Sequence, residues 1–145
     1  MLLPLAIPSR FRRLAAATAL AALSACVDRL PDQDLRILST TPAAKMSVDL
    51  LWQEFKADPA KAARQYHGHV VEITGHADAP AEGAMSLNFA QPEGGKVVAA
   101  LLAERAAAVA EAAKASPRIT IRCFVEGRSA DPASATVLLK SCVLQ

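Results

Sequence analysis

Apolar positions become regular after Ser47, where they recur with the 3.6-residue period of an α-helix. The apolar stripe consists of Val48, Leu51, Trp52 and Phe55. The Ser47 hydroxyl suits the N-cap of this helix, and an Asp followed by Pro at residues 58–59 is typical of the start of another helix. We therefore expect helical structure from residue 47 to residue 66, with Trp52 in the core.

After residue 66 the period falls to two, which is typical of β-strands. We expect strands at 67–79, 83–90, 96–102, 118–127 and 136–145, and a helix at 101–116 that Pro117 ends. Gly75 is expected to bend the first strand. In the fourth strand, Cys123 alternates with Arg122 and Phe124, so it should lie on the opposite face of the sheet from both.

The order of these elements is helix, three strands, helix, two strands. This order predicts a mainly β (α+β) domain, a five-stranded OB-fold Greek-key barrel with an N-terminal helix and a helix between strands 3 and 4. An α+β sandwich, with helices on one face of an antiparallel sheet, is the alternative.

The first 25 residues have the pattern of an export signal. Arg10, Arg12 and Arg13 precede an apolar run at 14–25 that is too short to span a bilayer, which takes about 20 residues. Residues 23–26, Leu-Ser-Ala-Cys, resemble the lipobox of bacterial lipoproteins. The resemblance implies that Cys26 is lipidated, by a palmitate-type acyl chain among others, after cleavage before it. An ordinary signal peptide with a chance cysteine is the alternative.

A lipidated Cys26 would place the chain in the bacterial cell envelope, facing the periplasm. Val27 follows the cysteine where an aspartate would favour the inner membrane, so we expect the outer membrane. Removal of the leader also changes the charge, because the formal +2 rests on its three arginines. Without them, 13 basic side chains face 14 acidic ones.

Residues 26–45 join this anchor to the domain. Two prolines, mixed charge and no sustained period favour a tether, and an arm packed on the domain through its Leu-Arg-Ile-Leu segment is the alternative. The expected organisation is a signal peptide at 1–25, the lipidated cysteine and tether at 26–45, and the OB-fold domain at 46–145.

From residue 46 to 145 the chain resembles the tRNA_anti-like family of bacterial OB-fold domains, many of which are lipoproteins. The resemblance rests on short motifs and their order: Ala62, Ala63, Tyr66, Gly68, Val70, Val71, Gly75, Gly127, Leu139 and Cys142. It implies an OB-fold barrel whose last strand ends on a Leu-x-x-Cys motif.

The two remaining cysteines fall on the last two predicted strands, which would be neighbours in a hairpin. If Cys123 faces Cys142, residue 121 faces 144 and residue 125 faces 140. In an oxidising compartment we expect a disulfide between them. Two buried free thiols, or a redox-active pair, are the alternatives.

The sequence gives little support for metal binding or catalysis. His67, His69 and His76 are not joined by a carboxylate or cysteine at ligand spacing, so we expect no metal site. Nucleophile elbows, phosphate loops and paired carboxylates are missing from the sequence, so we expect neither enzyme activity nor a cofactor.

We expect instead a binding or structural module of the envelope, which uses a face around Phe89, Arg122 and Phe124 for a protein, peptide or glycan. A nucleic-acid-binding OB domain is the alternative. It is disfavoured by the near-neutral charge and the scarcity of aromatic residues on the strands.

Overall fold

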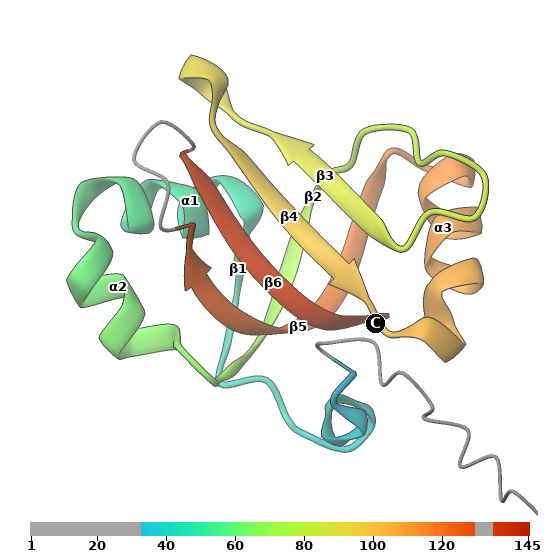
Figure 1. The fold of residues 1–145 in the computed structure, drawn as a ribbon, viewed down its shortest axis with the longest axis horizontal. Helices are drawn as coiled ribbons and strands as arrows, with labels where there is room; N and C mark the ends of the chain where they lie inside the picture. Colours follow the sequence, from blue (N-terminus) through green and yellow to red (C-terminus); the bar gives the residue numbers. More distant parts are fainter. Residues whose placement is uncertain (1–32, 130–134) are drawn as a thin grey trace, which may run out of the picture.

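The structure is a computed structural model, which describes residues 33–129 and 135–145 (Figure 1). The strands are β1 (Ala44–Ser47), β2 (Val70–His76), β3 (Ser86–Ala90), β4 (Lys96–Leu101), β5 (Arg118–Arg128) and β6 (Thr136–Leu144). The helices are α1 (Val48–Ala57), α2 (Pro59–Tyr66) and α3 (Ala106–Ala115). Three short 3-10 helices are η1 (Leu35–Leu38), η2 (Pro92–Gly94) and η3 (Ala103–Arg105).

The two N-terminal helices begin where their capping residues predict. The Ser47 hydroxyl accepts a hydrogen bond from the Leu50 amide at 3.1 Å, and Asp58 accepts one from the Lys61 amide at 3.0 Å. Each bond satisfies an amide that has no partner within the first turn of its helix. The four predicted stripe residues of α1 are all buried, which confirms the helical interpretation.

The strands form one sheet in the order β1-β2-β5-β6-β4-β3. β2 with β5, β5 with β6 and β3 with β4 are antiparallel, whereas β4 and β6 are parallel. This pairing is compatible with an OB-like barrel, and the α+β class is confirmed. The expected strand count is wrong, because β1 adds a sixth strand parallel to β2. The described strands form no ladder between β2 and β3, where a hydrogen bond runs from the Asp78 amide to the Asn88 carbonyl.

A β-bulge in β6 changes the register expected for the last hairpin. Ile121 pairs with Leu144 as predicted, but Val125 pairs with Leu139 and not with residue 140. The extra residue lies in β6, where Ser141 has φ of 53°. The same residue shifts the pairing of β6 with β4, so the bulge bends β6 against both neighbours.

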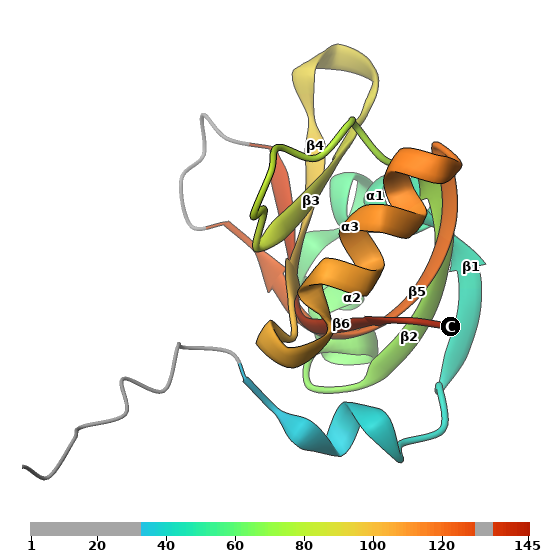
Figure 2. The same ribbon diagram turned by 90° about the vertical axis from the view of Figure 1, so that its right-hand side faces the viewer.

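Buried apolar residues form two clusters, one on each face of the sheet. The larger cluster joins the inner faces of β2–β6 to α1, α2 and α3. The smaller one consists of Ile37, Val70, Leu102, Phe124 and Val143. It lies beneath η1, which crosses the sheet apart from the helices in Figure 2. Both faces of the sheet are therefore covered over part of their area.

Part of the interval expected to be a tether packs on the domain. Residues 26–32 lie outside the described residues, but Ile37 is fully buried and the Asp34 amide donates a hydrogen bond to Ser141 Oγ at 2.8 Å. β1 then pairs with β2 from Ala44 to Ser47. The described residues 33–45 thus follow the packed-arm alternative, because Ile37 and the edge of β2 both offer partners to the arm.

Candidate ligand-binding site

The face predicted around Phe89, Arg122 and Phe124 does not exist as one surface. Phe89 lies in β3 and points into the main core, where it is 1% exposed. Phe124 and Arg122 are on the other face of β5, and η1 covers Phe124. The prediction was wrong because it assumed that alternate strand residues without a core role would face solvent. Of the three, Arg122 alone retains some exposure.

Cys123 and Cys142 form a disulfide with an S–S distance of 2.03 Å, which confirms the predicted pair. Their Cα atoms are 4.3 Å apart, and both residues are fully buried in the main core. The Ser141 bulge is what brings Cys142 opposite Cys123. Cys26, the predicted lipidation site, lies outside the described residues.

The three histidines do not come together with other ligand-type side chains. Among residues 33–129 and 135–145, the structure groups no three His, Cys, Asp or Glu side chains in a way that could hold a metal ion. His67 Nδ1 is 2.7 Å from the Glu126 carbonyl, so this ring is engaged with the backbone of β5.

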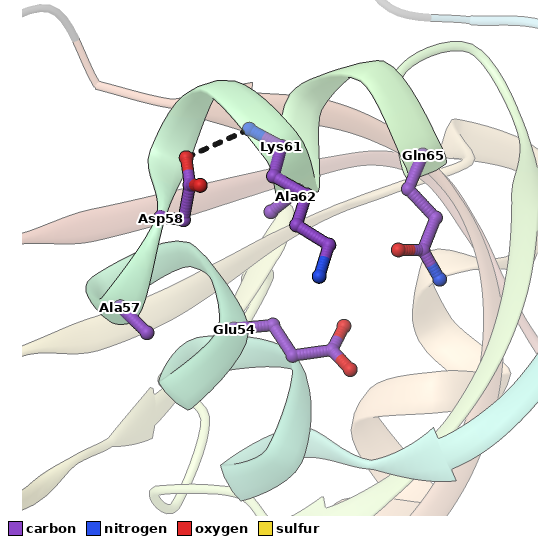
Figure 3. A pocket seen from close by; sticks show the side chains of 6 residues that line it. All are labelled: Glu54, Ala57, Asp58, Lys61, Ala62 and Gln65. Carbon is purple, nitrogen blue, oxygen red and sulfur yellow. Dashed lines mark hydrogen bonds between the residues drawn. The ribbon is translucent and has the colours of Figure 1, made fainter.

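A pocket of about 150 Å³ lies between α1 and α2 (Figure 3). Glu54, Lys61 and Gln65 extend toward one another across it. The Tyr66 hydroxyl accepts a hydrogen bond from Gln65 at 2.9 Å. Burial and the hydrogen bond with the Glu54 carboxylate raise the pKa of Tyr66 to about 12. The pocket holds charges of both signs, so it shows no preference for an anion or a cation.

A groove of about 410 Å³ separates α3 from the segment that precedes β3. Alanines of α3 and the half-exposed Met85 line it. Lys114 is 3.0 Å from Glu111, so the cation at this groove already has a partner. The groove is therefore mainly apolar.

A third cavity, of about 370 Å³, lies where η1, the start of α3 and the end of β6 meet. Both ribbon views place the C-terminal end of β6 near η1 and the start of α3 (Figures 1 and 2). We call it the arginine cavity, and it is lined by Leu38, Arg105, Ala108, Arg122, Val143 and Leu144.

Two guanidinium groups at this cavity come from different elements. Arg105 is exposed at the end of η3, and Arg122 is half-buried on β5. Arg122 donates one hydrogen bond to the Thr40 carbonyl at 3.3 Å, while its buried Nε has no partner. Within the described part of the chain, no carboxylate lies within 4.0 Å of either guanidinium.

The acidic residues nearest in the structure are engaged elsewhere. Glu72 is the cross-strand neighbour of Arg122, but its carboxylate is 3.2 Å from Lys45 Nζ. Asp34 forms an ion pair with Arg36 at 2.6 Å, and this pairing lowers the pKa of Asp34. The arginine cavity thus has surplus positive charge, which suits a ligand with a carboxylate or phosphate.

Sequence reasoning included Arg122 but missed Arg105. Arg105 stands between two predicted elements, and no periodicity singles it out. The cavity joins residues far apart in sequence, so only the packing of η1 against β6 reveals it.

The family model described as tRNA_anti-like matches residues 13–143. The chain belongs to the tRNA_anti-like family. Membership confirms the resemblance found in the motifs, and the match begins 33 residues before residue 46, where the resemblance was expected to start. No curated protein and no solved structure matches the chain.

In the part of this tRNA_anti-like chain that the structure describes, no helix is long and apolar enough to cross a membrane.

Proposed function

We propose that this tRNA_anti-like chain is a binding module of the bacterial envelope, exported and anchored by a lipid on Cys26. The module would face the periplasm from the outer membrane. It would hold a partner's anionic group at the arginine cavity and carry out no catalysis. The observation that carries the binding role is the pair of guanidinium groups at one cavity without a carboxylate partner within 4.0 Å in the described residues.

Two observations support the export half of the proposal. Cys123 and Cys142 are joined by a disulfide, and such bonds persist in oxidising compartments such as the periplasm. The family match begins at residue 13, so it includes the apolar run and the Leu-Ser-Ala-Cys sequence at 23–26.

The anchor is tested by expressing the full chain and its Cys26→Ser variant in a bacterial host. We expect the parent protein to fractionate with membranes and to carry the added mass of acyl chains, and the variant to lack that mass. Because Cys123→Ser also removes a thiol, it is the matched control and should still be acylated. Equal mass and equal membrane retention of Cys26→Ser and the parent would refute the anchor.

The binding role is tested by crosslinking in the envelope followed by purification of the chain. We expect a partner that the parent captures and that Arg105→Gln captures less. Arg64→Gln is the control, because it removes the same charge from an exposed position on α2. Equal capture by both variants would show that the arginine cavity does not bind the partner.

Nucleic acid is the competing ligand class, and it needs exposed aromatic rings for stacking. Phe89 and Phe124 are both buried, which weighs against it. Titration with single-stranded oligonucleotides at low salt tests the point. Tight binding that falls steeply with salt would favour nucleic acid and overturn the envelope role.

A further inference from the structure

The arginine cavity lies close to the point where the described chain begins. The Gln33 side chain donates a hydrogen bond to the Leu101 carbonyl at 3.2 Å and accepts one from the Ala103 amide at 2.6 Å. These bonds fix Gln33 beside η3, whose last residue is Arg105. Cys26 precedes Gln33 by seven residues, which reach at most about 25 Å when fully extended. A lipid on Cys26 would therefore hold this side of the domain near the membrane surface.

Exposed apolar side chains surround the same cavity. Leu35, Leu38 and Leu144 are 59%, 40% and 41% exposed, and two of them line the cavity directly. The other large exposed hydrophobic residues among those described are Leu50 and Met85, which lie elsewhere. Leucines beside arginines are typical of surfaces that rest at the boundary between lipid headgroups and acyl chains.

The charge of the cavity is complementary to an anionic headgroup. Arg36 is paired with Asp34, so the cationic surplus comes from Arg105 and Arg122. A planar guanidinium can donate two parallel hydrogen bonds to phosphate oxygens, and a buried Nε without a partner would gain one. A volume of about 370 Å³ is in the range of small-ligand sites, which is enough for a phosphodiester group.

We propose that the arginine cavity binds the phosphate of an anionic phospholipid in the membrane that holds the anchor. Arg105 and Arg122 contact the phosphate, while Leu35, Leu38 and Leu144 enter the interface. The domain then lies against the membrane through η1 and the start of α3. This inference rests on the proposed lipid anchor for its orientation, but the phosphate site itself does not need the anchor.

The test uses the full chain in vesicles of phosphatidylcholine, with and without phosphatidylglycerol. Amide hydrogen exchange is measured over residues 34–39 and 103–108. The anchor holds the protein on both kinds of vesicle, so a difference in exchange reports docking alone. We expect slower exchange of both segments with phosphatidylglycerol. Loss of one arginine contact should reduce the docking equilibrium roughly fivefold, so Arg105→Gln should lose most of the protection.

Two comparisons identify the source of the signal. Arg64→Gln should keep full protection, because it removes an equal charge from α2. Leu35→Ser should weaken protection without altering charge. Equal protection in both vesicles, or equal loss with Arg64→Gln and Arg105→Gln, would overturn the proposal. Equal protection by inorganic phosphate with phosphatidylcholine alone would replace the lipid by a free phosphate ligand.

Flotation of the same samples separates this inference from the anchor. A chain that fails to float with phosphatidylcholine lacks the anchor. The phosphate site then survives only if flotation requires phosphatidylglycerol and falls with Arg105→Gln. A chain that floats with both but shows no difference in exchange has the anchor and lacks the site.

Discussion

Gly95 contacts Trp52 so closely that a single added methyl group should be resisted. The backbone of Gly95 is extended, with φ of −70° and ψ of 162°, and any residue can adopt this conformation. An added Cβ would lie 2.5 Å from both Cε2 and Nε1 of the Trp52 indole, and closer still to Cζ2. The cost of Gly95→Ala is therefore steric and owes nothing to backbone strain.

The indole has little freedom to move aside. Trp52 is 5% exposed, its Nε1–H donates to the Ala135 carbonyl at 3.4 Å, and Lys56 Nζ lies 5.0 Å from its ring centroid. Overpacking of such a site costs about 1–3 kcal/mol. The stiffer unfolded chain of an alanine variant returns roughly 0.4–1 kcal/mol. We expect Gly95→Ala to lower the free energy of unfolding by about 1–2 kcal/mol.

A double-mutant cycle with Trp52→Phe tests the cause. Phenylalanine lacks the part of the indole that the methyl group would meet, so Gly95→Ala should cost less than half as much in that background. Urea unfolding followed by circular dichroism covers all variants. Fluorescence of Trp52, the sole tryptophan, follows those that keep it. Gly68→Ala is the control, because Gly68 has φ of 74° and no atom within 4 Å of an added Cβ. Its cost should be equal in both backgrounds. An unchanged cost of Gly95→Ala with Trp52→Phe would refute the reasoning.

Three further predictions concern other parts of the fold. Replacing Cys123 and Cys142 together by alanine removes a cross-link over 19 residues and should cost about 3 kcal/mol in urea unfolding; a difference near zero would contradict this. The pKa of Tyr66 is raised to about 12, so the folded state keeps a proton that the unfolded tyrosine loses near pH 10. Stability should therefore fall between pH 10 and 12 by about 1–3 kcal/mol more in the parent than in Tyr66→Phe, and parallel alkaline unfolding curves would exclude this role. Ile37→Ala should cost about 2–4 kcal/mol, because the side chain is fully buried beneath η1; a loosely attached arm would leave unfolding unchanged.

The elements that the sequence predicts well are those with local signals. Ser47 caps α1, and Asp58 with Pro59 starts α2, because the interactions that fix these ends lie within one turn. The alternation around Cys123 also placed it correctly on the face opposite Phe124. Which face is buried depends on partners distant in sequence, and here both faces are.

The features that the sequence did not predict depend on long-range packing. The Ala-Lys-Met-Ser segment of β1 has no pronounced strand propensity, and it becomes a strand because β2 offers an unpaired edge. The bulge at Ser141 is stabilised by a hydrogen bond from Asp34, 107 residues away. The arginine cavity depends on that arm, so its residues could not be grouped from their spacing.

The N-terminal arm also determines what the edge of the sheet presents to other molecules. Without β1, the seven residues of β2, including Val71 and Ile73, would offer their backbone amides and carbonyls to any extended chain. β1 is only four residues long, and its Lys45 is mostly exposed while it pairs with Glu72. A short edge strand with a lysine resists addition of strands from neighbouring molecules. The arm therefore protects the domain against self-association, a hazard that grows when many copies are confined to one membrane surface.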